Sequence, residues 1–270
     1  MADTALIDGT RYQRALGWLQ PHRIVLILIA LAIVVYCIFA LRWDWVPNYL
    51  GLAAQGIWRT IWLLVLSCAF GLALAIPLGF VQVTGPKILS VPALVFCTII
   101  RGTPLLLQLW LLYFGLGALS AQYPWIRESF LWPILRQAWP YGLLALTLSY
   151  AGYEGEVMRG AFAGVPRGQL EAGRAFGMSR FTIFRRIWLK QALQRALPTL
   201  AGETILQLKA TPLVATITMM EIYGVASRVR QETYIIYEPL LLLSLVYLTI
   251  TGILVLLLRK LESRIPVRLG

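Results

Sequence analysis

The chain has few charged residues, and acidic ones are the scarcest. Of its 270 residues, 13% are charged and 59% are hydrophobic, and there are only 12 acidic residues, one histidine and three cysteines. A water-soluble protein of this length could not cover its apolar surface with so few polar groups. His22 has no partners for a metal site or a Ser-His-Asp triad, and the cysteines (Cys37, Cys68, Cys97) lie in apolar runs where a thiol acts as a small hydrophobe. The sequence therefore offers no catalytic chemistry of its own.

Long apolar stretches dominate the chain instead, and its mean hydropathy is +0.73. About 20 apolar residues are needed to cross roughly 30 Å of hydrocarbon. Six stretches approach that length, at about 24–41, 57–80, 88–116, 141–160, 196–222 and 237–258. They predict an all-α fold, a polytopic membrane helical bundle with about six transmembrane helices.

The first stretch has two interpretations. Arg11, Arg14 and Arg23 precede it, as basic residues precede the apolar core of a secretory signal. Residues 41–43 (LRW) follow it, where a cleavage site would have small residues. This favours an uncleaved helix over a signal peptide.

Basic residues cluster between residues 159 and 195 and again after residue 258. Lys and Arg accumulate on the cytoplasmic side of membrane proteins, so we expect this cluster and both termini to be cytoplasmic. The net charge of +12 also raises nucleic-acid binding. The basic residues follow helix ends and do not form one soluble domain, which argues against that reading.

The basic segment around residues 164–190 reads as two helices and a turn. Gly177 can take the positive φ that ends the first helix, and Ser179 can cap the second by accepting from a free backbone N–H. Aromatic residues at helical spacing predict an apolar face on the second helix (Phe181, Phe184, Trp188). The segment is either a basic amphipathic helix on anionic lipid or a knob that binds a soluble partner.

The motif EAGRAFG, nine residues and IWL resembles the Glu-Ala-Ala loop of permease subunits of ATP-binding-cassette (ABC) importers. Its family pattern is EAA, three residues, G, nine residues, I, one residue, LP. The matching residues are Glu171, Ala172, Gly177, Ile187 and Leu189. The chain departs from the pattern at Gly173, where alanine is expected, and at Lys190, where proline is expected.

Other stretches resemble permeases for polar amino acids, particularly the histidine, lysine, arginine, ornithine and opine group. These stretches lie at 101–117 (RGTPLLLQLWLLYFGLG), 151–172 and 196–211. The resemblance implies a type I importer-like core of five helices plus one N-terminal helix. The expected parts are a tail with an accessory helix at 1–54, a core at 55–262 with its coupling loop at 164–190, and a cytoplasmic tail at 263–270.

The resemblance also implies partners. The chain has no G-x-x-x-x-G-K-[ST] motif, so we expect ATP and Mg²⁺ to bind a partner ATPase dimer and this chain to hold no cofactor. Such permeases work in pairs and receive their cargo from an extracytoplasmic solute-binding protein. The expected location is the bacterial inner membrane, with lipid contacts and no nucleic acid.

Polar side chains within the apolar stretches are candidates for the transport pathway, because an intramembrane charge costs roughly 2.5–3.5 kcal/mol on insertion scales. The candidates are Arg101, Tyr153, Glu154, Glu156, Glu203 and Lys209. Glu154 and Glu156 would lie about 200° apart around a helix, so they cannot face one pocket. Glu156, which matches a family pattern with Tyr153, either pairs with Arg159 or contacts substrate.

The stretch 196–222 is expected to border the pathway. Pro198, Gly202 and Pro212 interrupt it, and broken helices at membrane depth are tolerated where they line a cavity. Glu203 and Lys209 should lie on different faces of this segment, and Lys209 could equally brace an extracellular gate.

Arg101 marks an expected bend in the stretch 88–116. A continuous helix of that length would be longer than the membrane is thick, and Gly102 and Pro104 follow the arginine. A bend with a snorkelling arginine is favoured over a substrate contact.

Two acidic residues near the pathway would suit a cationic amino acid, although they could also serve the α-amino group of any amino acid; the resemblance implies a polar, basic amino acid or an opine. The alternative function is an ATP-independent secondary transporter or channel. Inverted repeats or an acidic relay across several helices would favour it, and the sequence contains neither. A membrane scaffold or sensor would not need polar residues along a pathway.

Overall fold

The computed structural model describes residues 21–263. The tail residues at 1–20 and 264–270, including Arg11 and Arg14, lie outside the described residues. Every regular element in the described part is helical, as predicted. The chain divides into two compact units, Met1–Asn48 and Tyr49–Gly270.

The first unit contains α2 (Pro21–Ala40), which corresponds to the stretch predicted at 24–41. Its side chains are almost all exposed, and it is long and apolar enough to cross a membrane. Two tryptophans hold the chain that leaves it. The Trp43 indole donates to the Cys37 carbonyl at 2.9 Å, and the Trp45 indole donates to the Arg42 carbonyl at 2.9 Å.

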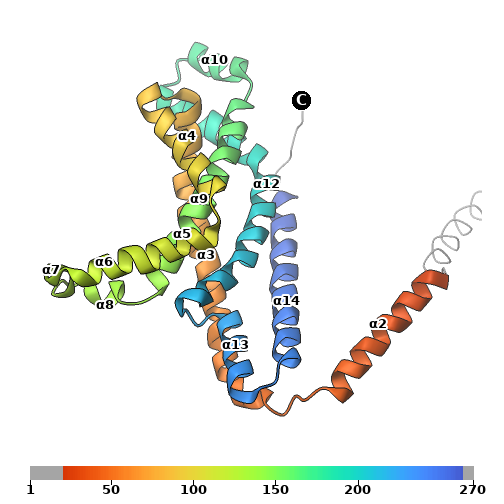
Figure 1. Cartoon of the computed structure of the whole chain (residues 1–270). Coiled ribbons are helices and arrows are strands. Elements are labelled where there is room, and N and C mark those ends of the chain that lie inside the picture. Colours follow the sequence, from red (N-terminus) through yellow and green to blue (C-terminus); the bar gives the residue numbers. More distant parts are fainter. Residues whose placement is uncertain (1–20, 264–270) are drawn as a thin grey trace, which may run out of the picture. The chain divides into compact units, whose positions relative to one another are not determined.

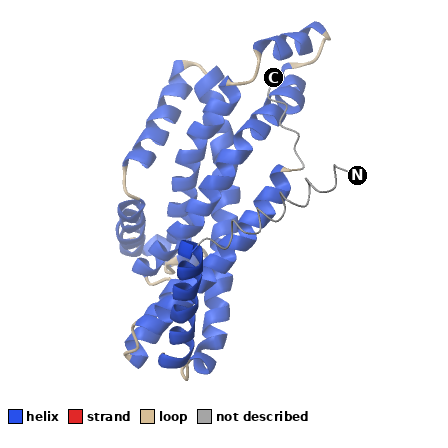
Figure 2. Ribbon diagram, turned by 90° about the vertical axis from the view of Figure 1, so that its right-hand side faces the viewer, coloured by secondary structure: helices blue, strands red, loops and turns tan. Residues whose placement is uncertain are grey.

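The second unit is a helical bundle (Figure 1). Its long helices are α3 (Val46–Thr84), α4 (Lys87–Gly102), α9 (Trp139–Ala163), α12 (Leu189–Ala210) and α14 (Tyr237–Glu262). Shorter elements join them, namely α5 (Leu105–Trp110), the π-helix η1 (Leu111–Leu116), α6 (Gly117–Gln122), α7 (Pro124–Arg127), α8 (Trp132–Leu135), α10 (Arg167–Ala175), α11 (Arg180–Ile183), the π-helix η2 (Phe184–Trp188), the 3₁₀ helix η3 (Thr211–Ile217) and α13 (Ile222–Thr233). Helix α10 lies at one end of the bundle and α13 at the other, and α14 runs from the end that carries α13 toward the end that carries α10 (Figures 1 and 2).

Small residues let the helices approach closely around α9. A Cβ on Gly152 would lie 2.5 Å from the Ile100 side chain of α4, and one on Gly155 would lie 2.8 Å from the Cys97 sulfur. Close contact at small residues is the usual way that membrane helices associate, since lipid removes the hydrophobic driving force between them. Helix α9 is therefore the centre of the bundle.

Four described helices are long and apolar enough to span a membrane, or five if the bent pair Arg180–Ile217 and Ile222–Thr233 counts as one span. All six predicted stretches are mainly helical, but three depart from a single apolar span, namely 88–116, 141–160 and 196–222. The stretch 88–116 divides at Thr103, so its bend after Arg101 is confirmed and its apolar part is Leu105–Gln122. The stretch 141–160 lies on α9, whose two glutamates and arginine make it too polar for the same criterion.

The stretch 196–222 is interrupted at one predicted position and not at the others. Helix α12 continues through Pro198 and Gly202, so the prediction of breaks there was wrong. A membrane helix tolerates a proline when neighbouring groups satisfy the carbonyl it frees. The helix changes to 3₁₀ at Thr211, directly before Pro212, and the chain then turns by 48° into α13 through Thr218, whose φ is 68°.

Candidate functional site

At the end of the bundle, α10 and α11 form a helical elbow, which we define as residues 164–190. Gly177 ends α10 with a φ of +72°, and Ser179 caps α11 by accepting from the Thr182 N–H at 3.3 Å. The Met178 N–H donates to the Gly173 carbonyl at 3.0 Å, and the Gly177 N–H donates to the Arg174 carbonyl at 2.9 Å. These are the paired bonds of a Schellman motif, which needs a left-handed residue at this position. The predicted turn at Gly177 and the predicted cap at Ser179 are confirmed.

The inner face of the elbow is fixed to the bundle. The Trp188 indole donates to the Phe162 carbonyl of α9 at 2.9 Å. Four aromatic rings from α3, α9 and the elbow pack on one another, namely Phe80, Phe162, Phe184 and Trp188. Ile187 and Leu189 pack against the same core. The elbow and α9 are thus held as one piece.

Gly173 explains one departure from the family pattern. A Cβ there would lie 3.0 Å from the Ile187 side chain and 3.2 Å from the Ile183 side chain, tighter than ordinary contact. Glycine at this position lets α10 approach η2 closely. At the other departure, Lys190, the helix continues without a break from η2 into α12.

The outer face of the elbow is exposed and mixed in character. Glu171 lies in the middle of α10, and it and Ala172 are exposed. Phe176 is 87% exposed and Phe181 is 71% exposed. The sequence predicted Phe181 on one apolar face with Phe184 and Trp188, and this was wrong for Phe181, because Ile183 packs in the core with those two residues instead. Large exposed aromatic side chains on a polar knob indicate an interaction surface.

A small cavity of about 220 Å³, lined by both polar and apolar side chains, lies between α9, α12 and the start of α5. Its lining residues are Thr103, Leu105, Ser149, Tyr150, Tyr153, Glu203, Leu206, Gln207 and Ala210. The Tyr150 hydroxyl and the Thr204 hydroxyl lie 2.9 Å apart. Tyr153 and Glu203 were predicted pathway residues, and the structure brings them together here. Lys209 is exposed and is not among the lining residues, so it lies on a different face from Glu203, as predicted.

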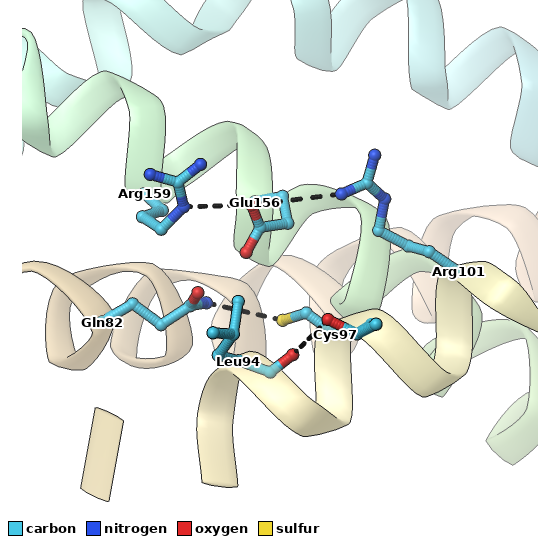
Figure 3. A network of polar contacts seen from close by, with 7 residues as sticks. Gln82, Leu94, Cys97, Arg101, Glu156 and Arg159 are labelled. Atoms are coloured by element: carbon cyan, nitrogen blue, oxygen red, sulfur yellow. Dashed lines mark hydrogen bonds and ion pairs between the residues drawn. The ribbon is translucent and has the colours of Figure 1, made fainter. Parts of the chain in front are cut away.

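Next to the cavity, two arginines face one glutamate (Figure 3). The Glu156 Oε2 atom accepts from Arg159 Nε at 3.0 Å and lies 4.0 Å from Arg101 Nη1. The Arg101 guanidinium carbon also lies 5.7 Å from the centre of the Tyr153 ring. The predicted pairing of Glu156 with Arg159 is therefore observed, and Arg101 joins α4 to α9 at the same carboxylate.

Glu154 lies on the other side of α9. Its side chain is fully buried, and neither carboxylate oxygen has a hydrogen-bond partner among the described residues. Its strongest electrostatic neighbour is Glu203. The two glutamates of α9 thus face different surroundings, as their spacing predicted.

Two buried polar residues were missed from the sequence. Gln207 donates to the Ser67 hydroxyl at 3.1 Å and to the Leu146 carbonyl at 2.9 Å, which joins α12 to α3 and α9. Glu221 caps α13 by accepting from the Tyr223 and Gly224 N–H groups at 2.9 and 2.8 Å. An acidic residue directly before a helix was the signal for Glu221. For Gln207 the signal was an amide in an apolar run.

The elbow motif and the helical core agree with the comparison to known proteins. Residues 71–267 match the family described as "Binding-protein-dependent transport system inner membrane component". The chain belongs to this family. It is a multi-pass inner-membrane permease subunit of an ABC importer, and such importers include ATPase and binding-protein partners.

Named relatives are similar over most of their length. The octopine transport system permease protein OccM of Rhizobium meliloti is 42% identical over 198 residues, 73% of this chain and 79% of that protein. The histidine/lysine/arginine/ornithine transport system permease protein HisM of Escherichia coli K12 is 36% identical over 79% of this chain and 89% of that protein. The arginine ABC transporter permease protein ArtM of Haemophilus influenzae is 38% identical over 81% of this chain and 94% of that protein.

Solved structures share the fold. The crystal structure of an amino acid ABC transporter with histidines has a TM-score of 0.69 and 27% identity, and the match covers 83% of this chain and 99% of that chain. The MetNI methionine ABC transporter has a TM-score of 0.61 and 18% identity, and the match covers 79% of this chain and 97% of that chain. At this low identity the likeness shows only that the two chains have the same fold. The family assignment sets aside the secondary transporter, the channel and the scaffold.

Proposed function

We propose that this chain forms part of the pathway for ATP-driven uptake of a polar amino acid, most simply a basic one, or of an opine. A second permease subunit, identical or homologous, would complete the pathway. A solute-binding protein would deliver cargo at the end of the bundle that carries α13, and the ATPase dimer would bind at the elbow end. ATP and Mg²⁺ would bind the ATPase, and this chain would hold no cofactor.

The elbow is the observation that carries this proposal. Its inner face is fixed to α9 and α3, and its outer face presents an acidic residue and two exposed aromatic rings. A rigid knob of this kind can transmit closure of a soluble motor to the membrane helices as a rigid-body movement. In this role Glu171 and Ala172 contact the ATPase and Gly177 shapes the turn, while Ile187 and Leu189 hold the knob to the bundle.

The cavity supports a substrate with a positive charge. Glu203 lines it, and Glu154, which interacts electrostatically with Glu203, has no hydrogen-bond partner among the described residues. A carboxylate there would recover part of the desolvation cost of an ammonium or guanidinium group. The named relatives include permeases for octopine and for arginine, whose side chain carries a guanidinium. Glu156, held by Arg159, contributes to the charge balance at the edge of the cavity.

The orientation follows from the same elbow. If the elbow is cytoplasmic, the C-terminal end of α14 points to the cytoplasm too, because α14 runs toward the end of the bundle that carries the elbow (Figure 1). With the additional helix α2, the N-terminus would also be cytoplasmic. In this arrangement residues 1–54 carry an accessory helix and residues 55–262 form the permease core.

Docking can be tested at Gly177. The change Gly177→Arg adds bulk where the backbone is exposed, and we expect normal membrane abundance with uptake reduced at least tenfold and no co-purification of the ATPase. Gly177→Asn is the matched control, because asparagine tolerates a positive φ and should retain most uptake. Wild-type uptake by Gly177→Arg at equal abundance would refute the docking role.

A further inference from the structure

We propose that Arg101 binds the α-carboxylate of the transported amino acid, and that Glu156 occupies Arg101 when the cavity is empty. This inference rests on the proposed function and adds the group that recognises the backbone of the substrate. It starts from an imbalance of charge. Two guanidinium groups, of Arg101 and Arg159, face the single carboxylate of Glu156 (Figure 3).

The two arginines do not share this carboxylate equally. Arg159 Nε donates to Glu156 Oε2 at 3.0 Å, whereas Arg101 Nη1 lies 4.0 Å from the same oxygen. Arg101 donates no hydrogen bond to any residue in the described part of the chain. An arginine fork fits a carboxylate through two parallel hydrogen bonds, so Arg101 retains the capacity to bind one.

Arg101 lies beside the cavity and is not among the residues that line it. Its guanidinium lies over the ring of Tyr153, which lines the cavity, and Thr103, two residues further along the chain, lines it as well. The side chain of Arg101 is 47% exposed, so other groups of the chain do not enclose it. Arg101 is also in the last turn of α4, directly before the break at Thr103, where the helix can adjust to a ligand.

The cavity wall itself carries an acidic group. Glu203 lines it from α12, and the buried Glu154 of α9 interacts electrostatically with Glu203. A cationic group beside the cavity and a carboxylate on its wall match an amino acid, whose α-carboxylate and ammonium or guanidinium group carry opposite charges. The volume of about 220 Å³ lies below the roughly 300–1,000 Å³ of pockets for drug-sized ligands, which suits a small solute.

Glu156 then pairs with Arg101 only while no substrate is bound. In the empty state it provides Arg101 with a weak partner at 4.0 Å, which limits the cost of an unpaired charge. When a substrate carboxylate binds Arg101, Glu156 keeps its stronger bond to Arg159. The exchange alters the link between α4 and α9, and α9 is the helix to which the elbow is fixed.

The test compares two ligands that differ in one group. L-arginine and agmatine share the guanidinium, and agmatine lacks the carboxylate. Both would be measured by direct binding to the purified complex of permeases and ATPase, without the solute-binding protein, whose own selectivity would mask the effect. We expect wild type to prefer L-arginine by about 10- to 100-fold, the range for a charge-assisted hydrogen bond. In Arg101→Gln we expect that preference to fall to less than about threefold, with agmatine binding unchanged.

The variant Glu156→Gln provides the second arm. It removes the competing carboxylate, so we expect L-arginine to bind two- to tenfold more tightly while agmatine does not change. If Arg101 only braces α4 against α9, Arg101→Gln will weaken both ligands equally or neither, and the inference is overturned. Arg101→Lys should restore part of the preference, because lysine keeps the charge without the fork.

The outcomes separate this inference from the proposed function. If the wild type binds L-arginine and Arg101→Gln keeps the same preference for L-arginine over agmatine, the role of Arg101 is refuted. The permease function is then left intact. Failure of wild type to bind either ligand, while purified together with its ATPase, refutes a basic amino-acid substrate and this inference with it.

Discussion

Gly79 of α3 packs directly against the backbone of α9, and we predict that Gly79→Ala destabilises the protein. A Cβ at this position would lie 2.6 Å from the Arg159 nitrogen and 2.8 Å from the Met158 carbonyl carbon, where ordinary contact begins at 3.4 Å. Both atoms belong to the backbone of α9, so no side chain can rotate to make room. The two helices must separate by about 0.8 Å at this point.

Two opposing contributions set the size of the effect. Overpacking of a well-packed core costs about 1–3 kcal/mol. Alanine in place of glycine within a helix returns about 0.8–1 kcal/mol. The difference is a loss of up to about 2 kcal/mol in the free energy of unfolding, or up to roughly 4–8 °C in Tm for a protein of this size.

The measurement is the Tm of the detergent-purified protein. It is obtained from the fraction of protein that stays monodisperse after heating to each temperature. Gly252→Ala on α14 is the matched control, because a Cβ there meets nothing within 4 Å, so only the gain in helix propensity remains. A Tm for Gly79→Ala equal to or above that of Gly252→Ala would show that the helices are not held as closely as the structure indicates.

Two further changes test the buried polar contacts. Glu221→Ala removes the acceptor for the first N–H groups of α13 and should cost about 1–2 kcal/mol of stability, whereas Glu221→Asp should cost less. Equal Tm values for the two variants would refute the capping role. Trp188→Phe keeps the aromatic packing but removes the hydrogen bond to the Phe162 carbonyl, so we expect a loss of about 1 kcal/mol of stability and less transport per ATP hydrolysed. An unchanged ratio of uptake to ATP hydrolysis would show that this hydrogen bond does not fix the elbow to α9.

The features predictable from the sequence were those that depend on local chemistry. Gly177 and Ser179 end and begin helices through their own backbone and side-chain preferences, so the elbow could be placed without the rest of the molecule. The pairing of Glu156 with Arg159 follows from their spacing on one helix. Membrane spans were visible because hydrocarbon requires a minimum apolar length.

The features that escaped prediction depend on tertiary contacts. Phe181 was placed on the apolar face by its spacing, but the π-helical turn at Phe184–Trp188 interrupts the helical period, and other side chains fill that face. Pro198 does not break α12, although its residue type suggested that it would. The position of Arg101 beside Glu156 joins residues 55 positions apart, which no local pattern could show.

Helix α9 connects the cavity to the elbow, because it contributes residues to both. Tyr153, on the cavity wall, and Phe162, which accepts the Trp188 bond from the elbow, are nine residues apart, or about 14 Å along the helix axis. A helix over that distance behaves as a rigid rod, so a tilt imposed at Phe162 must also displace Tyr153 and, one turn along, Glu156. Helix α4 packs closely on α9 at Gly152 and Gly155, whereas the break after Gly102 separates it from α5. The Arg101–Glu156 contact, at 4.0 Å, is looser than that packing, so a change in the angle between α4 and α9 would alter it, beside Tyr153 on the cavity wall.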